Sequence, residues 1–224
     1  MALARAGAPE FTLVWAKRQT AGRGRQGRPW DSPAGNLHSS LILRPEVAPS
    51  RAPEIGFAVA LSVADAVGAL LPGAASQFKW PNDVLLGGAK LAGILLESSG
   101  IAGGRIEALI VGMGMNVAQA PAGTPYPAAA LAERDPHVTV EAALGAYAEA
   151  FLGWYRRWQR DGFTPIREAW LAKAAGLGGP IAVNGPQGPI QGIFAGLDDD
   201  GALLLDGGRR VLAGDVFPMA QSEK

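Results

Sequence analysis

Residues 22–28 combine three glycines with three arginines after a β-rich run. They match the G-x-G-x-x-G pattern, but Pro29, Trp30 and Pro33 follow, so no helix begins there to face a pyrophosphate. Glycines let a backbone wrap closely around a ligand, and arginines offer forked donors to phosphate or carboxylate oxygens. We expect an anion-binding loop that is mobile when empty and ordered when occupied. A solvated basic loop and a nucleic-acid contact are the alternatives.

Two further segments carry polar groups beside apolar runs. Asn82 and Asp83 follow Pro81, which breaks the strand and lets their side chains project from a loop. Lys90 stands at the start of an apolar strand, where its ammonium could neutralise charge that develops in a transition state. An ordinary Asn-Asp turn and a hairpin lysine without a chemical role are the alternatives.

Glycines also interrupt the apolar run at residues 111–117, where Gly112 and Gly114 precede Asn116. Glycine inside a strand weakens it and marks a bulge or the close approach of a ligand. The same run is equally typical of a core strand that buries its methionines.

The composition excludes several other kinds of site. The 224 residues include no cysteine and only two histidines, which excludes a disulfide scaffold, a zinc ribbon, an iron–sulfur centre and a cysteine nucleophile. No direct motif for a protein-held metal is present. Twenty basic and twenty acidic residues balance, so bulk charge does not favour nucleic-acid binding.

The sequence also bears on location. Prolines and polar residues interrupt the uncharged stretch 108–132 too often for a spanning helix, and residues 1–9 lack the apolar core of a signal peptide. We therefore expect a cytoplasmic protein with neither DNA nor a membrane as its partner.

Strands and helices must position these groups, and the hydrophobic pattern predicts both. Helices are predicted at residues 50–71, 139–161 and 164–175. Strands are predicted at residues 11–17, 37–43, 77–80, 83–86, 91–97 and 107–111, the last four as a meander. After Gly176 the predicted strands are short, at residues 181–184, 190–197, 203–205 and 209–213. The pattern indicates an α+β domain over residues 1–175 with a mostly antiparallel sheet, and a small β-barrel over residues 176–224.

Four motifs, in this order and spacing, resemble those of the biotin protein ligases. They are the G-R-G-R-x-G-R loop, the K-W-P-N-D segment, the G-x-K-L-A-G-I-L-x-E hairpin and the G-x-G-x-N-V strand end. The loop is the most specific, and the similarity extends over nearly the whole chain. The resemblance implies the class II synthetase-like fold of biotin and lipoate ligases with an SH3-like C-terminal barrel. Residues 1–175 would then be the catalytic domain.

The resemblance also implies roles for individual residues. Lys90, Arg25 and Asp83 would be catalytic, with Lys90 on the biotin carboxylate and α-phosphate and Asp83 orienting or deprotonating the acceptor lysine. Trp30 would stack on the adenine, and Asn82 would serve the nucleotide and its metal. The other residues expected to line the biotin and adenylate site are Gln19, Gly22, Arg23, Gly24, Arg28, Gly93, Gly112, Gly114 and Asn116.

Two half-reactions are implied by the resemblance. Biotin and MgATP give biotinyl-5′-AMP and pyrophosphate, and the biotinyl group then passes to a lysine of the biotin carboxyl carrier domain of a biotin-dependent carboxylase. Two anions meet in the first step, so cationic screening is expected to contribute most to catalysis. Magnesium would arrive with ATP, near Asp83. Water destroys the mixed anhydride, so a loop that closes over it would protect it.

The sequence departs from the family pattern in two places. Family members carry a Ser-Thr-Asn strand before the first helix, whereas this chain begins with residues that resemble the tail of that helix. We expect a native start further upstream, and the alternative is a true variant with weak or altered ligand binding. An exposed strand edge there would favour a homodimer. No helix-turn-helix segment precedes the ligase motifs, so repressor activity is not expected.

Two alternative functions stay open at this point. One is a lipoate or octanoate ligase of the same fold, and the other is a non-catalytic protein that binds biotin or an adenylate. The intact arginine loop and the appended small domain favour biotin, and the retention of Lys90 and Asp83 favours catalysis.

Overall fold

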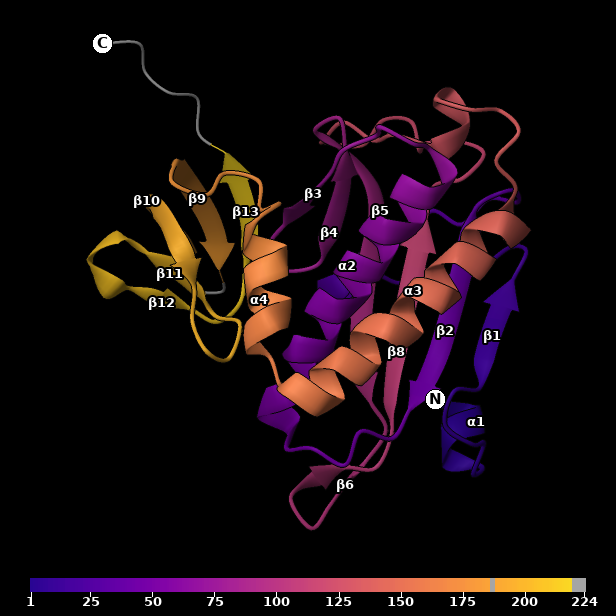
Figure 1. Cartoon of the computed structure of the whole chain (residues 1–224), viewed down its shortest axis with the longest axis horizontal. Coiled ribbons are helices and arrows are strands. Elements are labelled where there is room, and N and C mark those ends of the chain that lie inside the picture. Colours follow the sequence, from indigo (N-terminus) through magenta and orange to yellow (C-terminus); the bar gives the residue numbers. More distant parts are fainter. Residues whose placement is uncertain (186–187, 219–224) are drawn as a thin grey trace.

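A six-stranded antiparallel sheet forms the centre of the computed structural model, which describes residues 1–185 and 188–218 (Figure 1). The strand order is β1-β2-β8-β5-β4-β3. The strands are β1 (Leu13–Ala16), β2 (Leu37–Leu43), β3 (Ser76–Lys79), β4 (Asp83–Leu86), β5 (Ala89–Ser98) and β8 (Leu109–Met115). The predicted meander is confirmed as β3-β4-β5-β8, and a short hairpin of β6 (Ile101–Ala102) and β7 (Arg105–Ile106) joins its last two strands.

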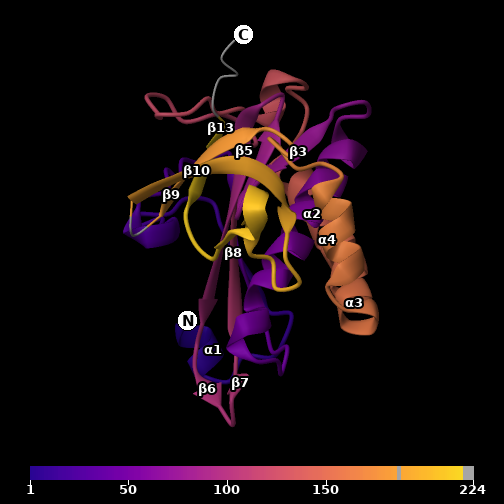
Figure 2. The same ribbon diagram turned by 90° about the vertical axis from the view of Figure 1, so that its left-hand side faces the viewer.

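Three helices cover one face of this sheet: α2 (Ala52–Leu70), α3 (Val140–Asp161) and α4 (Thr164–Leu171) (Figures 1 and 2). Alternate strand residues such as Leu41 and Val111 point toward these helices and join the main core. The Thr139 hydroxyl caps α3 by accepting a hydrogen bond from the Ala142 amide at 3.1 Å. The helices therefore leave only the opposite face of the sheet for a site.

The α2 helix is unusually apolar because it is a core element. By length and composition the segment Pro49–Leu70 could cross a membrane. However, 72% of its most apolar 18-residue stretch is buried inside the protein. A helix that is hydrophobic on all sides is typical of such a buried position.

The opposite face is only partly covered. A short helix, α1 (Ala2–Arg5), closes one end of it, where Ala4 packs against Ile42, Ala108 and Ile110. The loop between β1 and β2 crosses the other end and contains the arginine-rich segment. The strands beneath that loop carry the residues that the sequence motifs single out.

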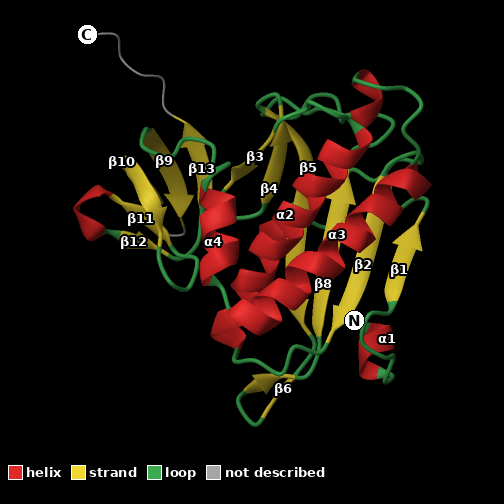
Figure 3. Ribbon diagram, viewed as in Figure 1, coloured by secondary structure: helices red, strands yellow, loops and turns green. Residues whose placement is uncertain are grey.

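A second sheet follows α4, in the order β12-β11-β10-β9-β13 (Figure 3). Its strands are β9 (Pro180–Gly185), β10 (Gly188–Leu197), β11 (Leu203–Leu205), β12 (Arg210–Val211) and β13 (Asp215–Pro218). The first part of β10 pairs with β9 and its last part with β11, with a register shift between Phe194 and Gly196. Residues 186–187 and 219–224 of the expected C-terminal domain lie outside the described residues.

The small β-barrel expected after residue 175 is not closed in the described part of the chain. β12 and β13 are the two edges of the second sheet and do not pair with each other in residues 188–218. β12 contributes only two residues. Closure of a barrel requires strands long enough to tilt and hydrogen-bond across the seam, so this small domain is an open, bent sheet.

Several predicted elements also differ from the structure in their bounds, and one strand was not predicted. The predicted helix 164–175 ends at Leu171, because the backbones of Lys173 and Ala175 instead hydrogen-bond to the backbone of Phe78 in β3. β8 continues past its predicted end to Met115. β13 was not predicted, since its four residues follow Gly214, end at Pro218 and show no alternation long enough to indicate a strand.

Candidate functional site

Strand register places a row of residues on the face of the sheet opposite α2 and α3. His38 of β2 lies opposite Gly114 of β8, which lies opposite Gly93 of β5. Gly93 in turn lies opposite Asp83 of β4, and Asp83 opposite Lys79 of β3. Directly paired residues share one face of a sheet, so two glycines leave the centre of this row free of side chains.

Trp30 lies against this glycine centre. A Cβ atom built on Gly114 would be 2.5 Å from Trp30 Nε1, and one built on Gly93 would be 2.9 Å from Trp30 Cζ3. No real side chain tolerates such distances, so only glycine allows the indole to approach the sheet. The close approach predicted from the strand glycines therefore exists, and it is made by a side chain of the arginine loop. Trp30 Nε1 is buried and has no hydrogen-bond partner within the described residues.

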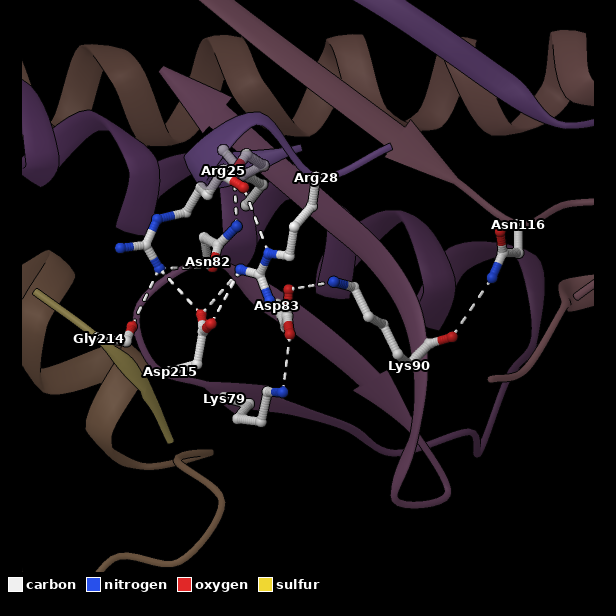
Figure 4. Close-up of polar contacts among 10 residues, drawn as sticks. Arg25, Arg28, Lys79, Asn82, Asp83, Lys90, Asn116, Gly214 and Asp215 are labelled. Atoms are coloured by element: carbon white, nitrogen blue, oxygen red, sulfur yellow. Dashed lines mark hydrogen bonds and ion pairs between the residues drawn. The ribbon is translucent and has the colours of Figure 1, made fainter. Parts of the chain in front are cut away.

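The arginine loop is a short irregular turn and not the start of a helix, as its prolines predict. The Gly24 amide donates to the Arg28 carbonyl at 2.7 Å, and the Trp30 amide donates to the Gly22 carbonyl at 2.9 Å. Residues Arg25–Gly27 form one 3-10 turn with Gln26 at φ 56°. The turn directs two guanidinium groups toward β4 and β13 (Figure 4).

Arg25 and Arg28 connect the loop to the rest of the site. Arg25 Nη1 donates to Asn82 Oδ1 at 3.3 Å and to the Gly214 carbonyl at 3.1 Å (Figure 4). Arg28 Nη2 pairs with Asp215 Oδ2 at 2.9 Å, and Arg25 Nη1 lies 3.5 Å from Asp215 Oδ1. One carboxylate of β13 therefore holds both arginines.

Burial lowers the pKa of the Arg25 guanidinium, and the nearby Arg28 charge acts in the same direction, whereas Asp215 and Asp83 oppose it. An arginine stays protonated in proteins despite such a shift. The Arg25 side chain is 21% exposed, so a phosphate placed beside it would be attracted more strongly than in water.

Asp83 lies between two lysines (Figure 4). Lys90 Nζ is 2.6 Å from Asp83 Oδ1, and Lys79 Nζ is 2.9 Å from Asp83 Oδ2. The Asp83 side chain is only 9% exposed. Lys90 Nζ also lies 5.3 Å from the Trp30 ring centroid. The structure thus brings together the three residues expected to be catalytic, since Arg25 contacts Asn82, the neighbour of Asp83.

The remaining expected residues occupy the margins of this group. Asn116 is 3% exposed, and its amide donates to the backbone carbonyls of Lys90 at 3.3 Å and Ala129 at 3.1 Å, so it braces the β5 strand at Lys90. The Gln19 amide oxygen accepts a hydrogen bond from the Ser32 hydroxyl at 2.8 Å.

Arg23 and Gly112 lie further from Asp83. Arg23 is 63% exposed and pairs with Glu97 at 3.4 Å, away from the other two arginines. A Cβ on Gly112 would meet only Leu95, whose carbonyl oxygen would be 3.3 Å away. The sheet surface at Gly112 is therefore more open than the surface at Gly114.

Sequence reasoning missed four residues of the site. Lys79 stands four residues before Asp83, and their antiparallel pairing across a tight turn could have indicated the contact. Tyr126, Asp215 and Phe217 come from a loop and from β13, and no local pattern points to them.

The residues around Asp83 do not fit a metal held by protein ligands alone. No group of three or more His, Asp or Glu side chains that could hold an ion exists in the described ranges. Asp83 already neutralises two ammonium groups, which would repel a divalent cation. Magnesium is commonly bound mainly by substrate phosphates and water, and a magnesium ion held in that way needs no protein cage.

A helix-backed antiparallel sheet that presents Lys90 and Arg25 beside strand glycines suits an anionic ligand such as a carboxylate or a phosphate. Residues 5–116 match the model of the Biotin/lipoate A/B protein ligase family, and residues 176–218 match the Biotin protein ligase C terminal domain. The chain belongs to the biotin protein ligase family.

Individual relatives agree with this assignment. The chain is 46% identical to the biotin–[acetyl-CoA-carboxylase] ligase of Paracoccus denitrificans, over 91% of this chain and 89% of that one. It is 35% identical to the bifunctional ligase/repressor BirA of Bacillus subtilis, over 96% of this chain and 68% of that one.

A solved structure extends the agreement to the fold. The biotin protein ligase from Aquifex aeolicus in complex with biotin and ATP superposes with a TM-score of 0.82 at 27% identity, covering 96% of this chain and 92% of that one. The α+β fold expected from the family resemblance is confirmed, apart from the open second sheet.

Proposed function

We propose that this protein is a biotin protein ligase that attaches biotin to a lysine of a biotin carboxyl carrier domain. In the first step, the biotin carboxylate attacks the α-phosphorus of ATP, forming biotinyl-5′-AMP and releasing pyrophosphate. In the second step, the deprotonated amine of the acceptor lysine attacks the acyl carbon, and AMP leaves.

One observation carries this proposal: Arg25 and Lys90 converge on the adjacent residues Asn82 and Asp83 beside the glycine centre of the sheet. A carboxylate and a triphosphate repel each other, and cations positioned where they meet lower that barrier. Lys90 supplies an ammonium on a side chain that is 28% exposed, and Arg25 supplies a guanidinium on a side chain that is 21% exposed. Magnesium would travel with ATP and be held mainly by its phosphates.

Asp83 has a second use in the transfer step. An acceptor lysine is protonated at neutral pH and must lose a proton before it attacks. Asp83 is the carboxylate beside Lys90, where the adenylate would lie, so it can orient the incoming amine or accept its proton. The loop bearing Arg25 and Trp30 would shield the anhydride from water meanwhile.

The match of residues 176–218 to a biotin protein ligase C-terminal domain favours biotin over lipoate or octanoate as the substrate. The decisive experiment is biotin-dependent exchange of labelled pyrophosphate into ATP, followed by mass spectrometry of an apo carrier domain from acetyl-CoA carboxylase. We expect exchange with biotin and a biotinylated carrier.

Two controls separate the alternatives. Lipoate replaces biotin, and a lipoyl domain of a dehydrogenase replaces the carrier. Lipoylation in preference to biotinylation would make the protein a lipoate ligase. Tight biotin binding by calorimetry without exchange would make it a binding protein.

A further inference from the structure

Lys79 is the first residue of the K-W-P-N-D motif, but no role was predicted for it. Its ammonium is 2.9 Å from Asp83 Oδ2, on the side of the carboxylate away from Lys90. The Lys79 side chain is 14% exposed, half as much as the 28% of Lys90. The two lysines therefore share one buried carboxylate, and Lys79 is the more enclosed of the two.

Aromatic rings hold Lys79 in place from the other side. Lys79 Nζ lies 4.8 Å from the Tyr126 ring centroid and 5.9 Å from that of Phe217, and the two rings are 5.5 Å apart. A cation over aromatic faces is attracted by their π-electrons. Tyr126 comes from the loop after β8 and Phe217 from β13, so both parts of the molecule contribute to holding Lys79.

The charges explain why a second lysine is needed. Lys90 pairs with Asp83 when no substrate is bound, so it must leave that carboxylate to reach a reacting anion. If Asp83 had no other partner, this departure would strand a buried charge, which is strongly unfavourable. With Lys79 in place the carboxylate keeps a partner, and Lys90 is easier to release.

We propose that Lys79 is a positioning residue: it keeps the Asp83 carboxylate neutralised so that Lys90 is free to act on the biotin carboxylate and α-phosphate. The inference rests on the proposed function for its catalytic consequence. Lys79 itself does not touch the reacting atoms and acts through Asp83.

The test begins with Lys79→Met, which removes the charge and keeps an apolar chain of similar length beside the rings. We expect kcat of biotin-dependent pyrophosphate exchange to fall about tenfold, on the scale of a partly lost transition-state donor, with KM for biotin and ATP changed by less than about threefold. Lys79→Arg should restore most of the rate, since a guanidinium can also pair with Asp83. Lys173→Met, an exposed lysine near β3, is the matched control and should behave as the parent protein.

A double-variant cycle distinguishes positioning from a merely structural or directly electrostatic role. If Lys79 acts through Lys90, adding Lys79→Met to Lys90→Ala should lower the rate by less than about twofold further, because coupled residues are not additive. If the rate of the double variant instead fell by the product of the two single-variant factors, the proposal would be overturned. A Lys79→Met rate equal to that of the Lys173→Met control would also overturn it.

Phe217→Leu provides a variant that keeps every charge, in case Lys79→Met folds poorly. It removes one ring beside Lys79, and we expect a smaller fall in kcat, about two- to fivefold, again without a change in KM. A Phe217→Leu rate equal to that of the parent, in a folded protein, would count against the aromatic support.

A readout that does not depend on catalysis keeps the inference separate from the proposed function. Acetylation of Lys90 by an activated ester, followed by peptide mass spectrometry, should be about three- to tenfold slower in Lys79→Met, because Asp83 then holds Lys90 alone. If the parent protein lacks biotin-dependent exchange, the proposed function fails while this labelling still decides the inference. Equal labelling of Lys90 in the two proteins would overturn it.

Discussion

At the scale of single residues, Lys90 is the cation with the freedom to follow the reacting charge. It is the more exposed of the two lysines on Asp83, and its ammonium lies 5.3 Å from the Trp30 ring centroid, beside the glycine centre. Lys90→Ala should therefore slow biotinyl-5′-AMP formation about 100-fold, the usual scale for losing one transition-state donor. Single-turnover formation of the adenylate from biotin and ATP measures this step directly.

The control for this substitution is Lys173→Met, which removes a lysine charge outside the site. A loss of less than about threefold in Lys90→Ala would mean that another group supplies the screening, since the expected effect of a true donor is much larger.

At the scale of the strand, β8 is the element whose sequence is most constrained by the site. Gly114→Ala would place a methyl group into the Trp30 ring, where the nearest ring atoms are 2.5 Å from the new carbon. We expect KM for biotin to rise by about tenfold or more and the free energy of unfolding to fall by about 1–3 kcal/mol, as in overpacked cores. Urea unfolding and exchange kinetics measure the two effects.

A glycine in a helix provides the opposite case. Gly145 lies in α3 with nothing within 4 Å of an added methyl group, so Gly145→Ala should stabilise the protein by about 0.5–1 kcal/mol through helix propensity. We expect the kinetic constants of Gly145→Ala to equal those of the parent protein. If the kinetic constants of Gly114→Ala were also unchanged, the close approach of Trp30 to the sheet would have no part in binding.

At the scale of the whole molecule, the second sheet reaches the site through β13. Asp215 pairs with Arg25 and Arg28, although some 190 residues of chain separate them. Asp215→Asn should loosen the arginine loop, so trypsin should cleave within residues 23–28 about three- to tenfold faster, equivalent to roughly 1 kcal/mol of local opening.

Asp200→Asn is the matched control, because Asp200 pairs with Arg210 inside the second sheet and does not contact the loop. Equal cleavage in the two variants would show that Asp215 does not restrain the loop. Release of biotinyl-5′-AMP into solution is expected to increase in Asp215→Asn alone.

The secondary structure and the list of reactive residues could be predicted from sequence because both depend on local patterns. Apolar spacing predicted α2 and α3 to within a few residues, and β-rich runs next to turn signals predicted β2 and β4 with their observed bounds. The motif residues Arg25, Asp83 and Lys90 stood out because charged groups beside glycine and apolar runs are locally unusual.

The mutual arrangement of those residues depends on the tertiary structure. β8 lies between β2 and β5, and this register brings Gly93 and Gly114 side by side beneath Trp30. Such pairings are selected by burial of the whole core, a non-local quantity that no short pattern encodes. The same reason explains why β13, the open second sheet and the sharing of Asp83 by two lysines emerged only from the folded chain: the sequence determined which groups were available, and packing decided which of them meet.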